Sequence, residues 1–308
     1  MATTTNITTT YAGEKAKGYI SAALLSANTL SSGLITIKAN VKKKLVIKRM
    51  DTSGLIADAT CDFTPTGQVD LDERYLEVKE LQVNLVLCKQ DFVDDWESIQ
   101  MGYSAFDKLP KDFQSYFIAL MAGKVAEANE QDIWNGTEGA GSYDGLVTKM
   151  LADGNVIDIA NPVAITAANV VDKLGEVVDA IPQEIYRKPD LMLYVSQGVY
   201  RSYIRALGGF GASGEGANGY QARGNNQAIG SVMFDGVQIA VAEGLTGSQI
   251  VAAQKSNLWF GTGLMSDWNK VQVIDTADTL GDQNVRFVMR FTADVNFGYG
   301  GEIVLYNA

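Results

Sequence analysis

The sequence predicts an α+β protein with an elongated body, because it contains one very long helix and one very long strand. The helix is predicted over Lys108–Gly136, where Pro110 fits the first turn and Asp112 lies near the positive end of the helix dipole. The strand is predicted over Val285–Phe297. These elements span roughly 39 Å and 43 Å, so they can lie side by side. A body of this shape favours a structural building block over an enclosed catalyst.

Hydrophobic periodicity defines both elements. The helix has an apolar face at 3.6-residue spacing, made of Phe113, Tyr116, Phe117, Leu120, Met121, Val125 and Ala128. Every second residue of the strand is apolar, and its other face carries Arg286, Arg290, Thr292, Asp294 and Asn296, with only Val288 against the pattern. Gly123 predicts a slight bend or a close neighbour in the helix. Asn135-Gly136 predicts a left-handed end.

Composition excludes several function classes. The 308 residues are enough for one large domain or two ordinary ones, and the formal net charge of −11 argues against tight, general nucleic-acid binding. One local patch is basic despite the acidic net charge. We interpret it as a solvated or intersubunit face in preference to a face that contacts DNA. It consists of Lys38, Lys42, Lys43, Lys44, Lys48 and Arg49.

The sequence has no histidine, which removes Ser–His–Asp and Cys–His nucleophile systems and histidine-rich zinc sites. Cys61 and Cys88 are too few for a disulfide framework, so we predict two free thiols and a reducing compartment. No apolar run approaches the roughly 20 residues of a membrane span. The segment after Lys15 and Lys17 resembles a signal peptide only weakly, and we predict use inside a cell.

The N-terminal third contains an arm and a long hairpin. Residues 1–34 are threonine-rich and form little core, and Ile35–Val41 alternates as a short strand. Leu45–Met50 continues extended, and the chain returns through Asp72–Lys89, whose apolar residues change face between Val78 and Leu81. This change predicts a bulge or a handover between two contact surfaces. The outer half is charged and projects, so it needs another surface, most simply that of a second copy.

A second unit begins near Ala160, after Ser142–Val147 leads into a strand. Thr166 is predicted to cap a helix with the apolar stripe Val170, Val171, Leu174, Val177, Val178 and Ile181. A buried strand follows at Leu191–Val195, and then a helix capped by Ser196. Asp235-Gly236 predicts a tight hairpin, and strands at Ile250–Ala253 and Leu258–Phe260 complete this α/β unit. The unit is therefore inserted into the first domain, which resumes at Val271 and ends in the strand Ile303–Tyr306.

Candidate ligand motifs are weak. Gly209–Gly214 matches G-x-G-x-x-G, but it follows a helix instead of a strand, so we interpret it as a long interaction loop. Acid pairs such as Asp94/Asp95 and Glu127/Glu130 are interpreted as solvated charges. A loose calcium-like set, Asp275, Asp278 and Asp282, lacks the twelve-residue loop pattern. We predict no cofactor, no metal and no catalytic residue.

The order of these parts resembles a known family. The chain has an arm, a charged hairpin, a long helix ending in Ile133-Trp134-Asn135-Gly136, the Gly145-Leu146-Val147 segment and an inserted α/β unit. It closes with R-F-x-x-R-F-x-A-D-V over residues 286–295. This is similar to the major capsid protein of tailed double-stranded-DNA bacteriophages, the Hong Kong 97-type fold. The resemblance covers nearly the whole chain and rests on architecture instead of one diagnostic motif.

The resemblance implies a domain organisation. Residues 1–40 would be an N-terminal arm, 41–90 the extended E-loop hairpin with its apex near Phe63–Val69, and 151–270 the axial domain. Residues 91–150 and 271–308 would form the peripheral domain with its spine helix, while 208–230 would point to the capsomer axis. Intersubunit contacts would come from Phe63, Pro65, Glu73, Arg74, Glu77, Lys79, Glu80, Gly209 and Gly211.

The same resemblance implies function and partners. The expected role is a non-enzymatic shell protein that self-assembles into pentamers and hexamers of a phage head, located in the virion and assembled in the host bacterial cytoplasm. Packaged DNA would meet the inner surface non-specifically, and separate scaffolding, portal and decoration proteins are expected partners, with no membrane. A long charged scaffolding region is missing, which implies a separate scaffold or none. No lysine lies between Arg49 and Lys79, so we predict no E-loop cross-link.

Three alternatives stay open. An encapsulin-type nanocompartment shell would hold protein and no nucleic acid. A nucleotide- or sugar-processing enzyme would lose activity when Gly211 or Gly214 is replaced. A tail or fibre component would form threefold or tubular assemblies.

Overall fold

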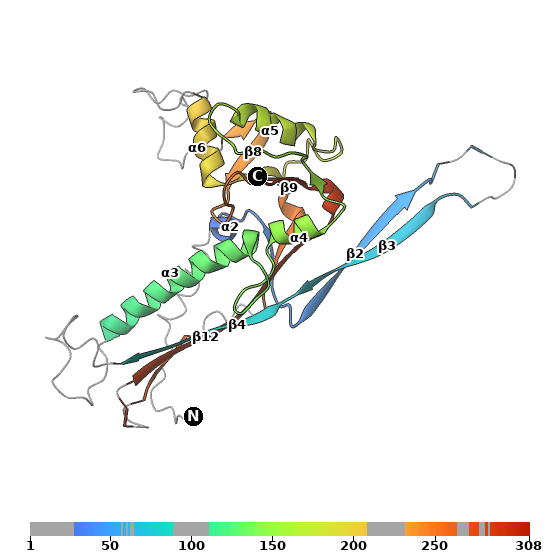
Figure 1. Ribbon diagram of the computed structural model, residues 1–308. Coiled ribbons are helices and arrows are strands. Elements are labelled where there is room, and N and C mark those ends of the chain that lie inside the picture. The colour runs from blue at the N-terminus through green and yellow to red at the C-terminus, as the bar shows by residue number, and fades with distance from the viewer. Residues whose placement is uncertain are drawn as a thin grey trace.

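The computed structural model describes most of the chain beyond the N-terminal residues, and its strands form three groups (Figure 1). These are a five-stranded sheet, a six-stranded sheet and a two-stranded ribbon. The described residues are 28–56, 58–59, 61, 65–88, 111–207, 232–263, 271–276, 281–282 and 284–308. None of the helices in these ranges is both long and apolar enough to cross a membrane.

The predicted long strand is confirmed as β12 (Asn284–Phe297), the centre of the five-stranded sheet. On one side it pairs antiparallel with β4 (Lys79–Cys88). On the other side it pairs with β11 (Val271–Asp275) and then with β10 (Leu258–Gly261), which also pairs parallel with β1 (Thr36–Lys38). Its odd-numbered residues from Val285 to Phe297 are buried, as the alternation predicts. Asp294 departs from the pattern because it is buried although it lies on the polar face.

The predicted long helix is confirmed as α3 (Lys111–Asn135), which runs in much the same direction as β4 and β12 in Figure 1. Ile118, Met121 and Trp134 of the helix share one hydrophobic core with Phe287 and Met289 of β12. Burial of apolar surface between the helix and the sheet therefore holds the elongated body together.

The predicted apolar face of α3 is partly wrong. Met121 is buried and Val125 is half-buried, but Ala128 is exposed. Asn129 and Glu130 occupy the buried positions instead, because each finds a hydrogen-bond partner inside the protein. The remaining predicted face residues, Phe113, Tyr116, Phe117 and Leu120, lie outside the residues whose side chains are described.

The two glycines of the helix differ from their predicted roles. Gly136 has no positive φ, so a left-handed end is wrong. It is needed for close approach, because a Cβ there would lie 2.3 Å from the carbonyl oxygen of Tyr143 and 2.6 Å from that of Asp132. Gly123 is exposed, the helix continues through it, and apart from its own helix backbone no atom of the described residues lies within 4 Å of where its Cβ would be.

The six-stranded sheet carries two helices on one face. Its strand order is β5 (Ile157–Asp158), β13 (Val304–Tyr306), β9 (Ile250–Gln254), β6 (Leu191–Val195), β8 (Val237–Val241) and β7 (Met233–Phe234). Helices α5 (Val170–Asp179) and α6 (Gln197–Ala206) pack against one face, whereas Tyr194 and Val251 on the other face join the core around α3. The two sheets thus share one body. Short 3₁₀ turns lie at Lys255–Asn257 and Gly300–Glu302.

Local signals in this unit are mostly confirmed. The strand Leu191–Val195 is confirmed, and the Ser196 hydroxyl caps α6 by accepting the N–H of Val199 at 3.3 Å. Asp235 and Gly236 have φ of 47° and 80° in the β7–β8 hairpin, as the tight turn requires. Helix α5 begins later than predicted, after Asn169 instead of Thr166, and Val171 of its predicted stripe is exposed.

Three strand predictions are corrected. Leu258–Phe260 is a strand, but it joins the five-stranded sheet, and the C-terminal strand joins the six-stranded one. Ser142–Val147 leads into a helix, α4 (Leu146–Ala152), because Leu146, Val147 and Met150 share one buried helical face. The strand predicted over Ile35–Val41 forms only at β1, where Ile37 is exposed instead of buried, and Asn40 has a φ of 64° and turns the chain.

The hairpin is confirmed as a ribbon of β2 (Lys44–Ser53) and β3 (Gln68–Glu77) that projects from the body (Figure 1). The predicted handover is also confirmed. Val78 separates β3, which pairs with β2, from β4, which pairs with β12. The chain therefore passes from the ribbon into the central sheet at a single residue, and the root of the ribbon lies there.

Candidate assembly interface

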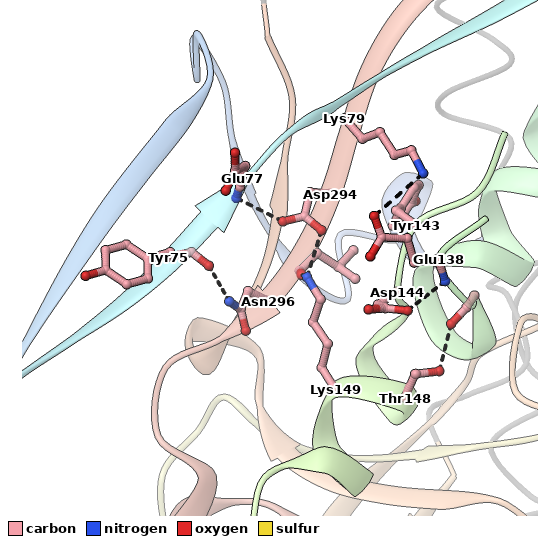
Figure 2. Close-up of polar contacts among 12 residues, drawn as sticks. Tyr75, Glu77, Lys79, Glu138, Tyr143, Asp144, Thr148, Lys149, Asp294 and Asn296 are labelled. Carbon is pink, nitrogen blue, oxygen red and sulfur yellow. Dashed lines mark hydrogen bonds and ion pairs between the residues drawn. The ribbon is translucent and has the colours of Figure 1, made fainter. Parts of the chain in front are cut away.

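Side chains of β12 fasten the ribbon at the point where main-chain pairing with β12 ends. Beyond Ala293, the Asp294 carboxylate accepts the main-chain N–H of Glu77 at 3.1 Å, and the Asn296 amide donates to the Tyr75 carbonyl (Figure 2). These two side chains replace the ladder hydrogen bonds that β3 would make if it stayed in the sheet. The ribbon can therefore leave the sheet while the Glu77 N–H and the Tyr75 carbonyl keep hydrogen-bond partners.

The Asp294 carboxylate is itself paired. The Lys149 ammonium, from α4, lies 2.8 Å from its Oδ1 and also donates to the Val295 carbonyl. Burial raises the pKa of Asp294, and this effect outweighs the lowering by Lys149 and by the backbone N–H donors. Lys149 remains about one-quarter exposed.

Arg74 forms the second fastening on the ribbon. Its guanidinium pairs with the Asp153 carboxylate and lies 4.5 Å from the ring centroid of Phe297. Burial alone would raise the pKa of Asp153, but hydrogen bonds and charge from Arg74, together with hydrogen bonds from Asn155, leave that pKa lowered. The ion pair ties the middle of β3 to the loop after α4.

Lys79 forms the third fastening. Its ammonium donates to the carbonyls of Gly139 at 2.7 Å and Ser142 at 2.9 Å, and it lies 4.0 Å from the Glu138 carboxylate. Figure 2 shows this loop turned toward the ribbon, with the Glu138 N–H donating to Asp144. The loop after the long helix is thereby clamped to the start of β4.

An apolar contact completes the root. Leu76 is fully buried with Val41 and Val78, over the backbone of Gly261 in β10. A Cβ on Gly261 would lie 2.6 Å from a Leu76 methyl group, so the glycine is required for this close packing. The root is fixed by packing as well as by charge.

A cavity of about 470 Å³ lies between the ribbon root and the loop after α3. Its charged lining mixes both signs, and most of these groups already pair with one another. It is lined by Tyr75, Glu77, Val78, Lys79, Glu138, Tyr143, Asp144, Lys149 and Asp294. Among the described residues, no group of three or more His, Cys, Asp or Glu side chains is arranged to hold a metal ion. We therefore interpret the cavity as part of a structural joint.

The N-terminal segment has a comparable fastening. The buried Glu130 carboxylate of α3 accepts the main-chain N–H of Thr29 at 3.1 Å and also its hydroxyl. That hydroxyl accepts the indole N–H of Trp134 at 2.8 Å. Burial raises the pKa of Glu130, against the hydrogen bonds that lower it. Helix α2 (Asn28–Ser31) is thus fixed to the long helix.

The predicted contact residues fall into three groups. Arg74 and Lys79 contact their own body, and Glu77 does so through its main chain. Glu73, Glu80 and Pro65 are exposed along the ribbon, at the start of β4 and near the ribbon tip. Phe63, Gly209 and Gly211 lie outside the described residues. Whether any of these residues contacts a second copy stays a prediction.

Sequence reasoning missed the residues that hold the root. These are Asp153, Lys149, Asp294 and Asn296. No local pattern distinguishes them from solvated polar residues, because their partners lie 79 to 221 positions away in the chain. In the calcium-like set, Asp282 accepts the hydroxyl of Thr276, and Asp278 lies outside the described residues. Cys61 and Cys88 are both free thiols.

Several solved structures share this fold. The capsid of a native GTA particle, determined with C5 symmetry, has a TM-score of 0.60 at 13% identity, covering 91% of this chain and 89% of that one. A satellite phage P4 procapsid matches with a TM-score of 0.56 at 11% identity, covering 94% and 97%. A virus-like particle from Pyrococcus furiosus matches at 0.55 and 12% identity, covering 96% and 98%.

No protein-family model and no curated protein sequence matches the chain. At these identities the likeness is one of fold, and it extends over nearly the full length of both chains in each comparison. The chain therefore has the Hong Kong 97-type capsid fold that its sequence predicts.

Proposed function

We propose that this protein is the subunit of an icosahedral phage-type shell, self-assembling into pentamers and hexamers around packaged double-stranded DNA. The observation that carries the proposal is the ribbon. Each of its strands has ten residues, about 33 Å of extended chain, and it stands away from the body (Figure 1). A two-stranded ribbon is marginal alone in water, so it gains stability by lying on another molecule.

The domain roles follow the same proposal. Residues 1–40 act as an arm, 41–90 as the E-loop, 91–150 and 271–308 as the peripheral domain, and 151–270 as the axial domain. Strands β10 and β13 each join the sheet of the other part. This exchange supports two domains that move as one body.

Assembly proceeds through many weak contacts repeated by symmetry. Small interfaces let a misplaced subunit leave, whereas multiplicity stabilises the finished shell. The fastenings at Arg74, Lys79 and Asp294 set the direction of the ribbon before a neighbour arrives. Preorganisation of this kind lowers the entropy cost of each contact. The exposed residues Pro65, Glu73 and Glu80, together with Phe63, Gly209 and Gly211, are proposed to contact neighbouring copies.

Partners and location follow from the shell role. The net charge of −11 supports non-specific contact with packaged DNA over tight binding. Separate scaffolding, portal and decoration proteins complete the proposed virion, which assembles in the host bacterial cytoplasm. The proposed role is structural and needs no catalysis.

A second candidate is an encapsulin-type shell that encloses protein cargo. The chain is similar to a virus-like particle from Pyrococcus furiosus over nearly the full length of both chains. This similarity supports a cargo shell as much as the similarities to phage capsids support a phage head. The two candidates share the assembly mechanism and differ in the enclosed contents.

Negative-stain microscopy and sedimentation of the purified full chain, over a range of concentration and salt, test the proposal. We expect closed shells of uniform diameter, and protease cleavage of the 41–89 segment in free subunits but not in shells. Particles containing protein cargo and no nucleic acid would favour the second candidate. Tubes or threefold rods would indicate a tail component. A compact monomer in every condition, with residues 41–89 resistant to protease, would contradict both shell candidates.

A further inference from the structure

The two faces of the ribbon differ in what covers them. In an antiparallel pair, residues opposite each other share a face, and the faces alternate along each strand. The register pairs Leu45 with Leu76 and Ile47 with Arg74 on one face. It places a second set of cross-strand pairs on the opposite face. These pairs are Lys44–Glu77, Val46–Tyr75, Lys48–Glu73, Met50–Leu71 and Thr52–Val69.

The first face is covered at its root by the body of the same chain. Leu76 is fully buried, Leu45 and Ile47 are half-buried, and Arg74 lies over Phe297. Farther out, this face becomes polar, with Asp72, Asp70 and Gln68 exposed. Its apolar residues therefore already have partners within the subunit.

The second face is exposed from root to tip, yet five of the ten residues in its cross-strand pairs are apolar. The exposed fractions are 42% for Val46, 46% for Tyr75, 63% for Met50, 66% for Leu71 and 55% for Val69. We call these five residues the apolar stripe. Past the end of β2, Leu55 and Ile56 are also exposed, Ile56 almost fully. The charged pair Lys48–Glu73 lies between Val46–Tyr75 and the outer three residues of the stripe. Soluble monomers rarely expose this much apolar surface along one element unless it binds something.

The charges on this face identify the class of partner. Lys44 lies opposite Glu77 and Lys48 lies opposite Glu73, so the charges cancel in pairs along the stripe. A face that binds nucleic acid or an anionic lipid surface would carry an excess of basic residues. A neutral face that mixes apolar residues with balanced charges suits a protein surface.

We propose that the apolar stripe is the face by which the ribbon docks on a second copy of this chain. This inference rests on the proposed shell function and goes further, because it assigns the contact to one face and to apolar burial instead of to the charges of the ribbon. The subunit's own body packs on the opposite face, so the stripe points away from it. The fold is shared with capsids and a virus-like particle, which makes a second copy the partner to commit to.

The test compares two double variants of the full chain. Met50→Thr with Leu71→Thr alters a cross-strand pair in the stripe, and threonine keeps a high strand propensity. Asp70→Thr with Asp72→Thr is the matched control, because it alters exposed residues on the opposite face of the same ribbon. All four side chains are exposed in the subunit, so both variants should unfold within about 2 °C of the wild type.

We expect M50T/L71T to raise the concentration needed for assembly at least about tenfold, as measured by sedimentation velocity and negative stain. D70T/D72T should assemble at the wild-type concentration. Wild-type assembly should also persist or strengthen when sodium sulfate is added, because apolar contacts strengthen and exposed charge contacts weaken. Assembly of M50T/L71T at the wild-type concentration would overturn the proposal, as would loss of assembly only in D70T/D72T.

Failure of the shell function would be visible separately. If the wild type forms no shells but forms small oligomers that M50T/L71T loses, the stripe is a self-association surface without a shell, and the docking proposal stands. If the wild type is a monomer at every concentration, or if it assembles only with a different protein bound to the stripe, the docking proposal fails.

Discussion

The carboxylate of Asp294 accepts the main-chain N–H of Glu77 at 3.1 Å, so a side chain of the long strand β12 holds the last residue of β3, at the root of the ribbon. The same carboxylate pairs with Lys149 at 2.8 Å. One buried acid therefore links the ribbon, the central sheet and helix α4. Its removal tests how the ribbon is held.

Replacing Asp294 with Ala should lower the free energy of unfolding by about 1–3 kcal/mol, because Glu77 loses its acceptor and Lys149 loses its counter-charge. The estimate lies below that for a fully buried pair because Lys149 is partly exposed. Hydrogen exchange at the Glu77 amide should accelerate as well. Lys124→Ala, which breaks the exposed pair with Glu127, is the control and should leave stability unchanged within the error of the measurement. Equal effects of the two variants would contradict the assigned role of Asp294.

Alanine substitution should have opposite effects on stability at two glycines, one just after α3 and one inside it. Gly136→Ala should destabilise by about 1–3 kcal/mol, because its Cβ would meet the backbone oxygens of Tyr143 and Asp132. Gly123→Ala should stabilise by about 0.5–1 kcal/mol, because the position is an open helix interior. Denaturant unfolding measures both. A neutral Gly136→Ala would mean that the loop after α3 can move aside.

The anchor of α2 can be tested at Thr29. Thr29→Val keeps the shape but removes the hydroxyl, so Glu130 loses a donor and the Trp134 indole N–H loses its acceptor. We expect a loss of about 1–3 kcal/mol, since both groups are buried. The exposed Ser31→Ala in the same short helix serves as control and should stay within about 0.5 kcal/mol. Retention of wild-type stability in Thr29→Val would show that the hydroxyl network is dispensable.

The raised pKa values of Glu130 and Asp294 give stability a definite pH dependence. Because burial raises both, the folded protein takes up these protons at higher pH than the unfolded chain. Their stabilising contribution is present below the unfolded values of about 4.3 and 3.9 and is lost as pH rises through the folded values. Asp153 has the opposite effect on the pH dependence of stability, because its pKa is lowered in the folded protein. Its stabilising contribution is lost only as the pH falls below the ordinary pKa of an aspartate.

Unfolding of the wild type and of the Glu130→Gln/Asp294→Asn double variant, at pH 7 and pH 5, measures this dependence. We expect the free energy of unfolding of the wild type, relative to that of the double variant, to be larger at pH 5 than at pH 7. A shift in favour of the double variant would show that the two carboxyls ionise more readily in the folded protein than in the unfolded chain.

Local sequence signals, namely periodicity, capping residues and turn residues, predicted the elements that short-range interactions determine. The long helix, the long alternating strand, the Ser196 cap and the Asp235-Gly236 hairpin are examples. In each of these elements the deciding interactions lie within a few residues or within one repeating face. The handover at Val78 was predictable for the same reason, because a change of face appears directly in the order of residues.

Long-range contacts decided the remainder. Gly145-Leu146-Val147 reads equally well as a strand or as the start of a helix, and the core below α4 selected the helix. The assignment of β10 and β13 to their sheets depended on pairing with strands far away in sequence. Ala128 lost its predicted place to Asn129 and Glu130 because distant donors satisfied those polar groups.

The sequence by itself determined that a long helix and a long strand form the body and that a hairpin leaves it, since backbone propensity and hydrophobic spacing are local properties. Only the tertiary structure decided how that hairpin is held and which of its faces stays open. Asp294, Asn296 and Arg74 act on residues or loops far away in the chain. Burial at the root is what separates a covered face from the exposed apolar stripe, and burial is a property of three-dimensional packing that no local pattern contains.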